Sequence, residues 1–285
     1  MSALAAFGCL AALATLGGCA LDDEGEPPVP PEYRSTYYRI DRIDLPQGAQ
    51  DADAAALDLD DDGEVDNVGG NALASFQAVI ETAGERLPLA VDAGLDGGRV
   101  DWILEVGHDS VLPGRAAAAL HAAADSDRDL LYEITDGIAL VGDGRQDGDL
   151  LRTRAGDGRI PASFLADVNG DWPVTWVNGI AVALAMREQP GGELEGRLGF
   201  ATRGDFGPVI AGPLAEFMTE RLQAGTLVYA AEMDADRDGI ITEEEFLADE
   251  LTRILLNPDL DLDHDGGFES MSAGFRVHAT PVDVE

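Results

Sequence analysis

The sequence predicts an α+β fold, with an antiparallel β-rich body, sandwich- or barrel-like, followed by a helical C-terminal module. Short stretches that alternate apolar and polar residues recur between residues 37 and 202, with Gly/Asp turns such as Gly142-Asp143-Gly144 between them. Such alternation is typical of strands in an antiparallel sheet. From Leu214 to about Leu256 the apolar residues instead recur at helical spacing. No strand–helix–strand alternation, which would indicate a parallel sheet, is found in the sequence.

The individual elements follow from the same periodicities. Strands are predicted at residues 37–45, 100–106, 130–135, 137–141, 179–186 and 195–202. A helix is predicted at residues 72–83, where Leu73, Phe76 and Ile80 share one face, Asn71 is a good N-cap and Gly84 follows the end. Residues 274–284 alternate again, so we expect a last strand that returns to the body.

The composition excludes several function classes. The chain of 285 residues has 55 Asp and Glu against 18 basic residues, all of them arginine, and a formal net charge of −37. Such a surface repels nucleic acid and anionic membranes, and the absence of lysine excludes lysine-dependent phosphate binding and Schiff-base chemistry. Since 45% of the residues are hydrophobic, the chain is not a disordered acidic tail. The natural counter-ion is a hard cation.

The N-terminus has the pattern of a targeting segment. Residues 1–18 carry no charged side chain, and a stretch this short indicates a secretory signal rather than a spanning helix. The motif Leu16-Gly17-Gly18-Cys19 resembles the lipobox of bacterial lipoproteins, although the basic residues that usually begin such signals are absent. The resemblance implies acylation of Cys19 and anchoring at the bacterial outer membrane or cell surface, on the periplasmic or extracellular face. The alternative is an ordinary cleaved signal peptide with an incidental cysteine.

These observations divide the chain into four segments. Residues 1–18 are the lipoprotein signal peptide, and residues 19–35, acidic and proline-rich, are a tether. Residues 36–225 form the β-rich body with an N-terminal calcium loop. Residues 226–285 form a calcium-binding module plus the final strand.

The clearest chemical motif lies at residues 234–245. Aspartates stand at its first, third and fifth positions, Gly239 at the sixth, and Glu245 at the twelfth. The motif resembles the calcium loop of the EF-hand family, in which calcium takes six to eight oxygen ligands. The resemblance implies an EF-hand module here, with ligands from Asp234, Asp236, Asp238, Ile240 (through its carbonyl), Thr242 and Glu245.

Two further loops resemble each other and the D-x-D-x-D-G loops of dockerins and thrombospondin type 3 repeats. Both lack an acid at the twelfth position, where Gly69 and Ser272 stand. We therefore expect weaker calcium binding, and the alternative is an Asp-rich turn without an ion. The candidate ligands are Asp58, Asp60, Asp62, Glu64 and Asp66 in the first loop, and Asp261, Asp263, Asp265, Gly267 and Glu269 in the second. Residues 167–171 have similar spacing but are more simply an ordinary turn.

Calcium loops of the EF-hand family usually pair through the apolar residue at the eighth position. Ile241 and Phe268 occupy this position in the 234 and 261 loops. The sequence therefore predicts that these two loops face each other.

Signatures of catalysis are weak. The four histidines have no zinc-binding spacing, and no G-x-S-x-G elbow exists. Consecutive residues such as His108-Asp109-Ser110 point in different directions, whereas a triad is assembled from distant segments. Trp172 and Trp176 could stack on sugar rings, but core burial is the simpler explanation.

The sequence therefore predicts a secreted calcium-binding lipoprotein with a non-catalytic, structural or adhesive role, in which one to three Ca²⁺ ions staple the fold. The alternatives are a calcium-stabilised hydrolase or carbohydrate-binding module, and a calcium sensor or buffer. The expected partners are calcium, the membrane through a lipid anchor only, and an unknown surface protein or polysaccharide. Nucleic acid is not expected.

Overall fold

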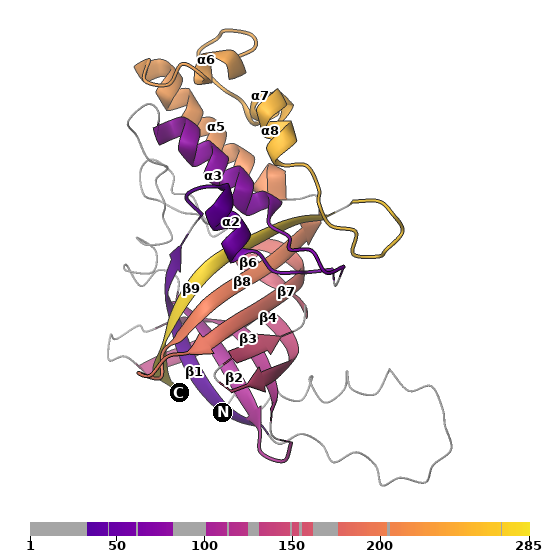
Figure 1. The fold of residues 1–285 in the computed structure, drawn as a ribbon. Helices are drawn as coiled ribbons and strands as arrows, with labels where there is room; N and C mark the ends of the chain where they lie inside the picture. The colour runs from indigo at the N-terminus through magenta and orange to yellow at the C-terminus, as the bar shows by residue number, and fades with distance from the viewer. Residues whose placement is uncertain are drawn as a thin grey trace.

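The computed structural model describes residues 33–44, 46–60, 62–81, 101–112, 114–124, 131–148, 150–153, 156–161, 176–203, 206–268 and 270–285. The strands among them form a barrel, and the helices gather at one end of it (Figure 1). None of the described helices combines the length and the apolar character that a membrane-crossing helix needs.

The barrel is a meander that closes on itself, antiparallel except for a short parallel pairing between the start of β4 and the end of β9. The strands are β1 (Tyr33–Asp44), β2 (Asp101–Asp109), β3 (Arg115–Ala124), β4 (Leu131–Asp147), β5 (Leu150–Thr153), β6 (Gly156–Pro161), β7 (Trp176–Glu188), β8 (Leu194–Arg203) and β9 (Ser270–Val284). Each strand pairs with its sequence neighbours except β5 and β6, which form no pair with each other among the described residues and share the place between β4 and β7. The antiparallel pairing of β1 with β9 joins the first and last strands and closes the barrel. Because β5 and β6 share one place, the nine strands make an eight-stranded barrel.

Side chains alternate between the interior and the exterior of the barrel. On β8, Leu194, Leu198 and Phe200 belong to the central apolar core, whereas Arg197 between them lies on the outer face. Val182, Leu184 and Met186 of β7 also point inward, with Ala183 and Ala185 outside. The interior is therefore a packed core of side chains, as expected for a barrel of this size.

The helices extend the same core beyond the barrel end. They are α2 (Ala49–Ala55), α3 (Val68–Glu81), α5 (Phe206–Ala224), α6 (Ala230–Met233), α7 (Glu243–Ala248) and α8 (Glu250–Leu255). Phe76 of α3 stacks on Phe246 of α7 with ring centroids 5.7 Å apart, and both rings are buried. Leu214 and Phe217 of α5 join the cluster that fills the barrel. Elements from both ends of the chain thus share one core.

The fold confirms the predicted antiparallel, barrel-like β body and its returning last strand. It does not show a self-contained helical module at the C-terminus. The helices after residue 225 have four to six residues each. The last element is β9, a strand of the barrel between β1 and β8. The helical stretch predicted to run to about Leu256 is broken at Asp249, which caps α8 through a bond from the Thr252 N–H of 3.0 Å.

Candidate metal centres

Three groups of acidic side chains could each hold a metal ion. They are Asp58, Asp60 and Asp62; Asp234, Asp236 and Glu245; and Asp261, Asp263 and Asp265. Within each group, one carboxylate oxygen from every residue lies within 4.8 Å of the others. All three groups fall in loops that the sequence singled out, and oxygen-only ligand sets of this kind suit hard divalent cations.

The 234 loop is folded by its own carboxylates. Asp234, the last residue before the turn, accepts from the N–H groups of Asp238 and Gly239 at 3.2 and 3.0 Å. Asp236 accepts from the Asp238 N–H at 3.1 Å, and Asp238 accepts from the Ile240 N–H at 2.8 Å. These bonds hold the backbone in a tight coil around the carboxylates.

Glu245 closes the 234 loop from the first turn of α7. Its Oε2 accepts from the backbone N–H and the hydroxyl of Thr242, both at 3.0 Å, and its Oε1 accepts from the Ala235 N–H at 3.0 Å. The Thr242 hydroxyl accepts in turn from the Glu245 N–H, which completes a capping box. The Thr242 bonds, with those from Asp236 and Ala235, hold the pKa of Glu245 below its usual range, so a charged carboxylate is presented to the loop.

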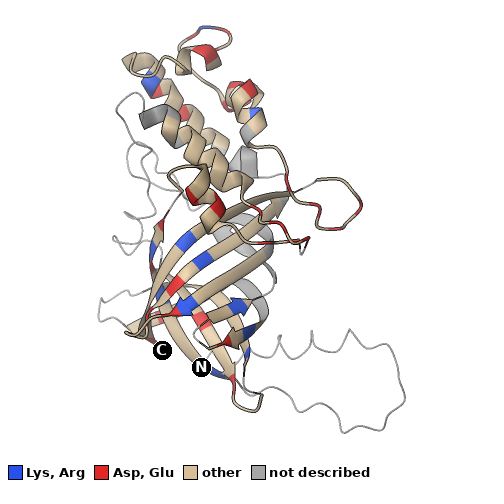
Figure 2. Cartoon of the chain, in the orientation of Figure 1, with Lys and Arg blue, Asp and Glu red and all other residues tan. Residues whose placement is uncertain are grey.

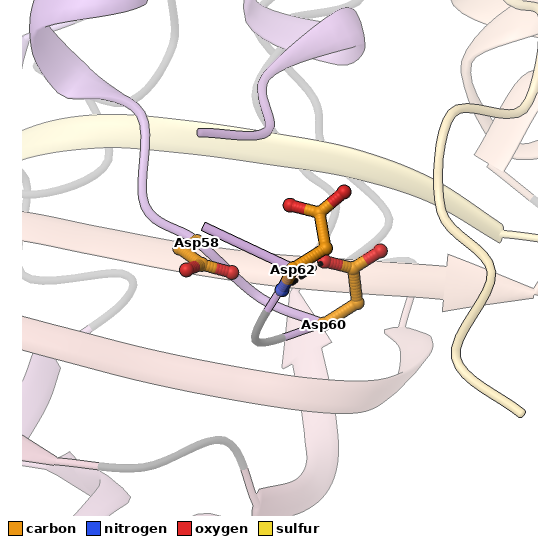
Figure 3. A group of neighbouring side chains, drawn as sticks. All are labelled: Asp58, Asp60 and Asp62. Carbon is orange, nitrogen blue, oxygen red and sulfur yellow. Dashed lines mark hydrogen bonds between the residues drawn. The ribbon is translucent and has the colours of Figure 1, made fainter. Parts of the chain in front are cut away.

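The 58 loop has the same internal hydrogen-bonding arrangement, and Figure 3 shows its three clustered aspartates, Asp58, Asp60 and Asp62. Asp58 accepts from the Gly63 N–H at 3.1 Å, Asp60 from the Asp62 N–H at 3.3 Å, and Asp62 from the Glu64 N–H at 2.7 Å. An isolated antiparallel bridge between Leu57 and Asp66 closes the loop at its base.

The 261 loop repeats this arrangement a third time. Asp261 accepts from the Gly266 N–H at 2.8 Å, Asp263 from the Asp265 N–H at 3.2 Å, and Asp265 from the Gly267 N–H at 2.9 Å. Its base is closed by a bridge between Leu260 and Ser270.

The three loops share one backbone conformation as well as one bonding pattern. The glycine at the sixth position has a φ of +93° in Gly63, +87° in Gly239 and +91° in Gly266, a region that disfavours other residues. Two residues at the fourth position, Arg237 and His264, also have a positive φ. The sequence repeat therefore corresponds to a structural repeat.

Several predicted ligands lie outside the clustered oxygens. Asp66 is 9% exposed, and its carboxylate accepts from the Leu59 N–H of the same loop at 2.8 Å instead of joining the cluster of Asp58, Asp60 and Asp62. Burial raises the pKa of Asp66 to about 7, helped by the charges of Asp60 and Asp259. The carboxylates of Asp238 and Glu64 are not in the groups either, and Ile240, Thr242 and Gly267 would contribute through the backbone or a hydroxyl. Glu269 and Cys19 lie outside the described residues.

The 58 and 261 loops meet on the outer wall of the barrel. Leu59 and Leu262, at the second position of each loop, join Leu260 in a small apolar cluster with Ala183 of β7 and Ala201 of β8. The likeness of the two loops was predicted from the sequence, but their contact was not.

Polar residues beside the two loops tie them together more tightly. Asp259, just before the 261 loop, accepts from the Ser272 N–H at 2.8 Å and from its hydroxyl, and that hydroxyl accepts from the Val68 N–H at 2.9 Å. Asn67, buried at 4% exposure, accepts from and donates to Gly274 of β9. Neither Asn67, at the tenth position of the 58 loop, nor Asp259, two residues before the 261 loop, was predicted from the sequence as a site residue.

The predicted pairing of the 234 and 261 loops is wrong. Ile241 is buried at 3% exposure in the main core, and its N–H donates to the Thr219 hydroxyl of α5 at 2.7 Å. Phe268 is 65% exposed, and among the described residues the two form no bridge. Thr219 thus takes the place of a partner loop.

One buried titratable pair lies away from the loops. Glu105 and His121, both 5% exposed, form a bond of 2.9 Å, and the Tyr37 hydroxyl donates to Glu105 at 3.3 Å. Burial alone would raise the pKa of Glu105, but the bonds from His121, Ser35 and Tyr37 lower it. Glu105 of β2 and His121 of β3 satisfy each other's hydrogen-bonding groups and join the two strands. We therefore interpret the pair as structural.

Comparisons with protein-family models, with curated proteins and with solved structures found no match to this chain. The geometry of the loops is therefore the ground for assigning a function.

Proposed function

We propose that this chain is a non-catalytic calcium-binding lipoprotein, in which calcium in the three loops staples the fold. The observation that carries the proposal is the threefold repetition of one arrangement, with three carboxylates whose oxygens lie within 4.8 Å, a glycine with positive φ, and aspartates that bond the loop's own N–H groups. A single acidic turn could have this shape without an ion. Three copies in a chain of net charge −37 favour a shared ligand.

Electrostatics supports a stapling role. Two carboxylates about 4 Å apart repel by about 4 kcal/mol at an effective dielectric near 20, and each loop holds three such groups. A bound Ca²⁺ converts this repulsion into attraction. The 58 and 261 loops lie against one patch of the barrel wall and adjoin α3 and β9, so their ions would join the two ends of the chain.

Calcium is the ion that we favour among hard cations. Aspartates at alternating positions with a backbone carbonyl supply a flexible set of oxygens, which suits the six to eight ligands of calcium better than the strict octahedron of magnesium. The 234 loop, with Glu245 added, is expected to bind most tightly. The lipobox-like motif at Cys19 supports anchoring at the bacterial outer membrane or cell surface.

Neutralising Asp58 and Asp261 tests this function. The double variant Asp58→Asn, Asp261→Asn keeps acceptors for the Gly63 and Gly266 N–H groups but removes one charge from each site. Titration calorimetry with calcium should count fewer ions than in the parent, with the 234 site retained.

The melting temperature gives a second readout of the same variant. In EGTA the variant should melt at or above the parent, because repulsion is relieved, and in saturating calcium it should melt below the parent. An unchanged ion count, or melting temperatures that do not depend on calcium in either protein, would contradict the proposal for these two loops.

A further inference from the structure

Arginines form a row across the outer face of the barrel, against the overall charge of the chain. Residues in direct register on neighbouring strands are Arg115 of β3, Arg145 of β4, Arg152 of β5, Ala185 of β7, Arg197 of β8 and Arg276 of β9. The row therefore contains five of the 18 basic residues. In Figure 2 blue segments lie on neighbouring strands of the barrel, below the acidic loops.

The register places all of these side chains on one face. Leu151, Leu184, Leu198 and Phe275, which flank the row, point into the barrel core, so the row itself faces outward. Neighbouring strands lie about 4.8 Å apart, and five steps span about 24 Å. The arginines thus present guanidinium groups at short, regular intervals along the wall.

A row of this kind is unfavourable unless something compensates it. Like charges directly opposite each other on neighbouring strands destabilise a sheet. Asp51 of α2 forms an ion pair of 2.9 Å with Arg276, and Arg197 donates to the Ala56 carbonyl at 2.7 Å. For the exposed Arg145 and Arg152, by contrast, no acidic partner exists among the described residues. Burial and the neighbouring Arg152 lower the pKa of Arg197, which is consistent with mutual repulsion.

The row borders a groove of about 1310 Å³ between the 58 loop and the strand ends near Gly114 and Asp147. Four of the arginines, Arg115, Arg145, Arg152 and Arg197, line it, against two acids, Asp58 and Asp147. The groove is therefore cationic in a strongly anionic protein. Guanidinium forks bind sulfate and carboxylate groups in bidentate fashion.

We propose that this groove binds a short anionic oligosaccharide, with sulfate or carboxylate groups on the arginine row. None of the described residues that line the groove is aromatic, so they offer nucleic-acid bases no surface on which to stack. Asp147, which also lines the groove, can accept hydrogen bonds from sugar hydroxyls. The inference depends on the arginines and not on calcium binding.

Titration of the full chain at one fixed calcium concentration tests the proposal. The probes are a sulfated dextran oligomer, an oligogalacturonate, neutral maltohexaose, and single-stranded DNA matched in charge to the sulfated probe. We expect binding of the sulfated oligomer, the oligogalacturonate or both, weakened by added salt, with weaker binding of DNA and none of maltohexaose. The two anionic sugars distinguish sulfate from carboxylate recognition.

The double variant Arg145→Gln, Arg152→Gln should weaken this binding at least tenfold. It should also fold with an equal or higher melting temperature, because repulsion in the row is relieved. The matched control Arg34→Gln, Arg253→Gln removes two exposed charges outside the groove and should bind like the parent. Equal binding by the groove variant, no binding of either anionic sugar, or equally tight binding of DNA would overturn the proposal.

Discussion

Replacing Asn67 by alanine should be among the most destabilising single changes outside the barrel core. The side chain is 4% exposed and makes four bonds to backbone groups. Its Oδ1 accepts from the Gly274 N–H at 2.7 Å and the Gly70 N–H at 3.0 Å. Its Nδ2 donates to the Ala52 carbonyl at 2.8 Å and the Gly274 carbonyl at 3.1 Å. One amide thus joins α2, the start of α3 and β9.

The magnitude follows from these four bonds. Each hydrogen bond contributes about 1 kcal/mol net, and a buried group left without a partner costs about 1–3 kcal/mol. The bond to Gly70 also caps α3, a role usually worth about 1 kcal/mol. We expect the free energy of unfolding to fall by about 3–5 kcal/mol, out of the 5–15 kcal/mol typical of a domain.

The backbone around Asn67 is packed so closely that no neighbouring side chain can move in and take over the hydrogen bonds of the lost amide. A Cβ on Gly274 would lie 2.8 Å from the Ala55 carbonyl oxygen, and one on Gly69 would lie 2.7 Å from the Ser272 carbonyl oxygen. The backbones of the helical segment and β9 are therefore in close contact. Removing the amide should leave the four backbone groups unsatisfied rather than rearranged.

Urea unfolding at saturating calcium, followed by circular dichroism, measures the change. The matched control is Asn257→Ala, because Asn257 is exposed and makes one local bond, from its Nδ2 to the Pro258 carbonyl at 3.1 Å. That change should cost less than about 0.5 kcal/mol. If Asn67→Ala lowers the free energy of unfolding by less than about 1 kcal/mol, with the slope against urea unchanged, the four bonds do not stabilise the fold as expected.

Three further predictions concern single side chains. Glu245→Gln should weaken the tightest calcium site at least tenfold by calorimetry, whereas Glu244→Gln, an exposed neighbour, should not; equal affinities would remove the 234 loop as the strongest site. The hydrogen bond from His278 to Asp41 raises the pKa of His278. The protonated His278 therefore stabilises the folded protein by about 1 kcal/mol or less. This contribution is fully present below about pH 6.5 and is lost as the pH rises through the raised pKa of His278. His278→Gln should flatten the unfolding free energy between pH 6 and 9, and an unaltered slope would contradict this assignment. Cys19→Ala should abolish lipid attachment, and mass spectrometry of a mature N-terminus without lipid in the parent would contradict anchoring.

Strands with clear alternation could be predicted from the sequence, whereas β3 could not. Residues Arg115–Ala124 are mostly alanine, a strong helix former that gives no contrast between two faces. Their strand conformation depends on pairing with β2 and β4, which is context that a local pattern does not contain. The segments predicted at 130–135 and 137–141 form one strand, β4, for the same reason, since β3 pairs along both.

The three loops could be predicted because their information is local. Alternating aspartates bond the N–H groups two to five residues ahead, and the glycine permits the turn. Their placement was not predictable, since it depends on partners such as Asn67 and Gly274, which are 207 residues apart. Asp66 was expected to bind the ion for its position in the loop, but its buried carboxylate accepts from the Leu59 N–H and does not join the clustered oxygens.

The contact of the 58 and 261 loops was missed because it needs a surface of the barrel, formed by Ala183 and Ala201, that no local pattern indicates. The pairing of the 234 and 261 loops failed in the same way. The Thr219 hydroxyl of α5 accepts from the Ile241 N–H. Ile241 therefore pairs with α5 and not with the 261 loop, a choice that the tertiary structure makes and the local sequence does not indicate.

The most direct test of the account is a thermal scan of the parent protein, in saturating calcium and in EGTA, that follows the β-sheet and helical signals separately. An ion that binds only the folded form stabilises it by about 2.7 kcal/mol at a hundredfold excess over Kd, so two sites contribute about 5 kcal/mol. For a domain of this size each kcal/mol shifts the melting temperature by about 2–4 °C. We therefore expect EGTA to lower the melting temperature of the β signal by about 10 °C or more. A β transition that is unchanged, with only helical signal lost, would contradict calcium as the staple of the barrel.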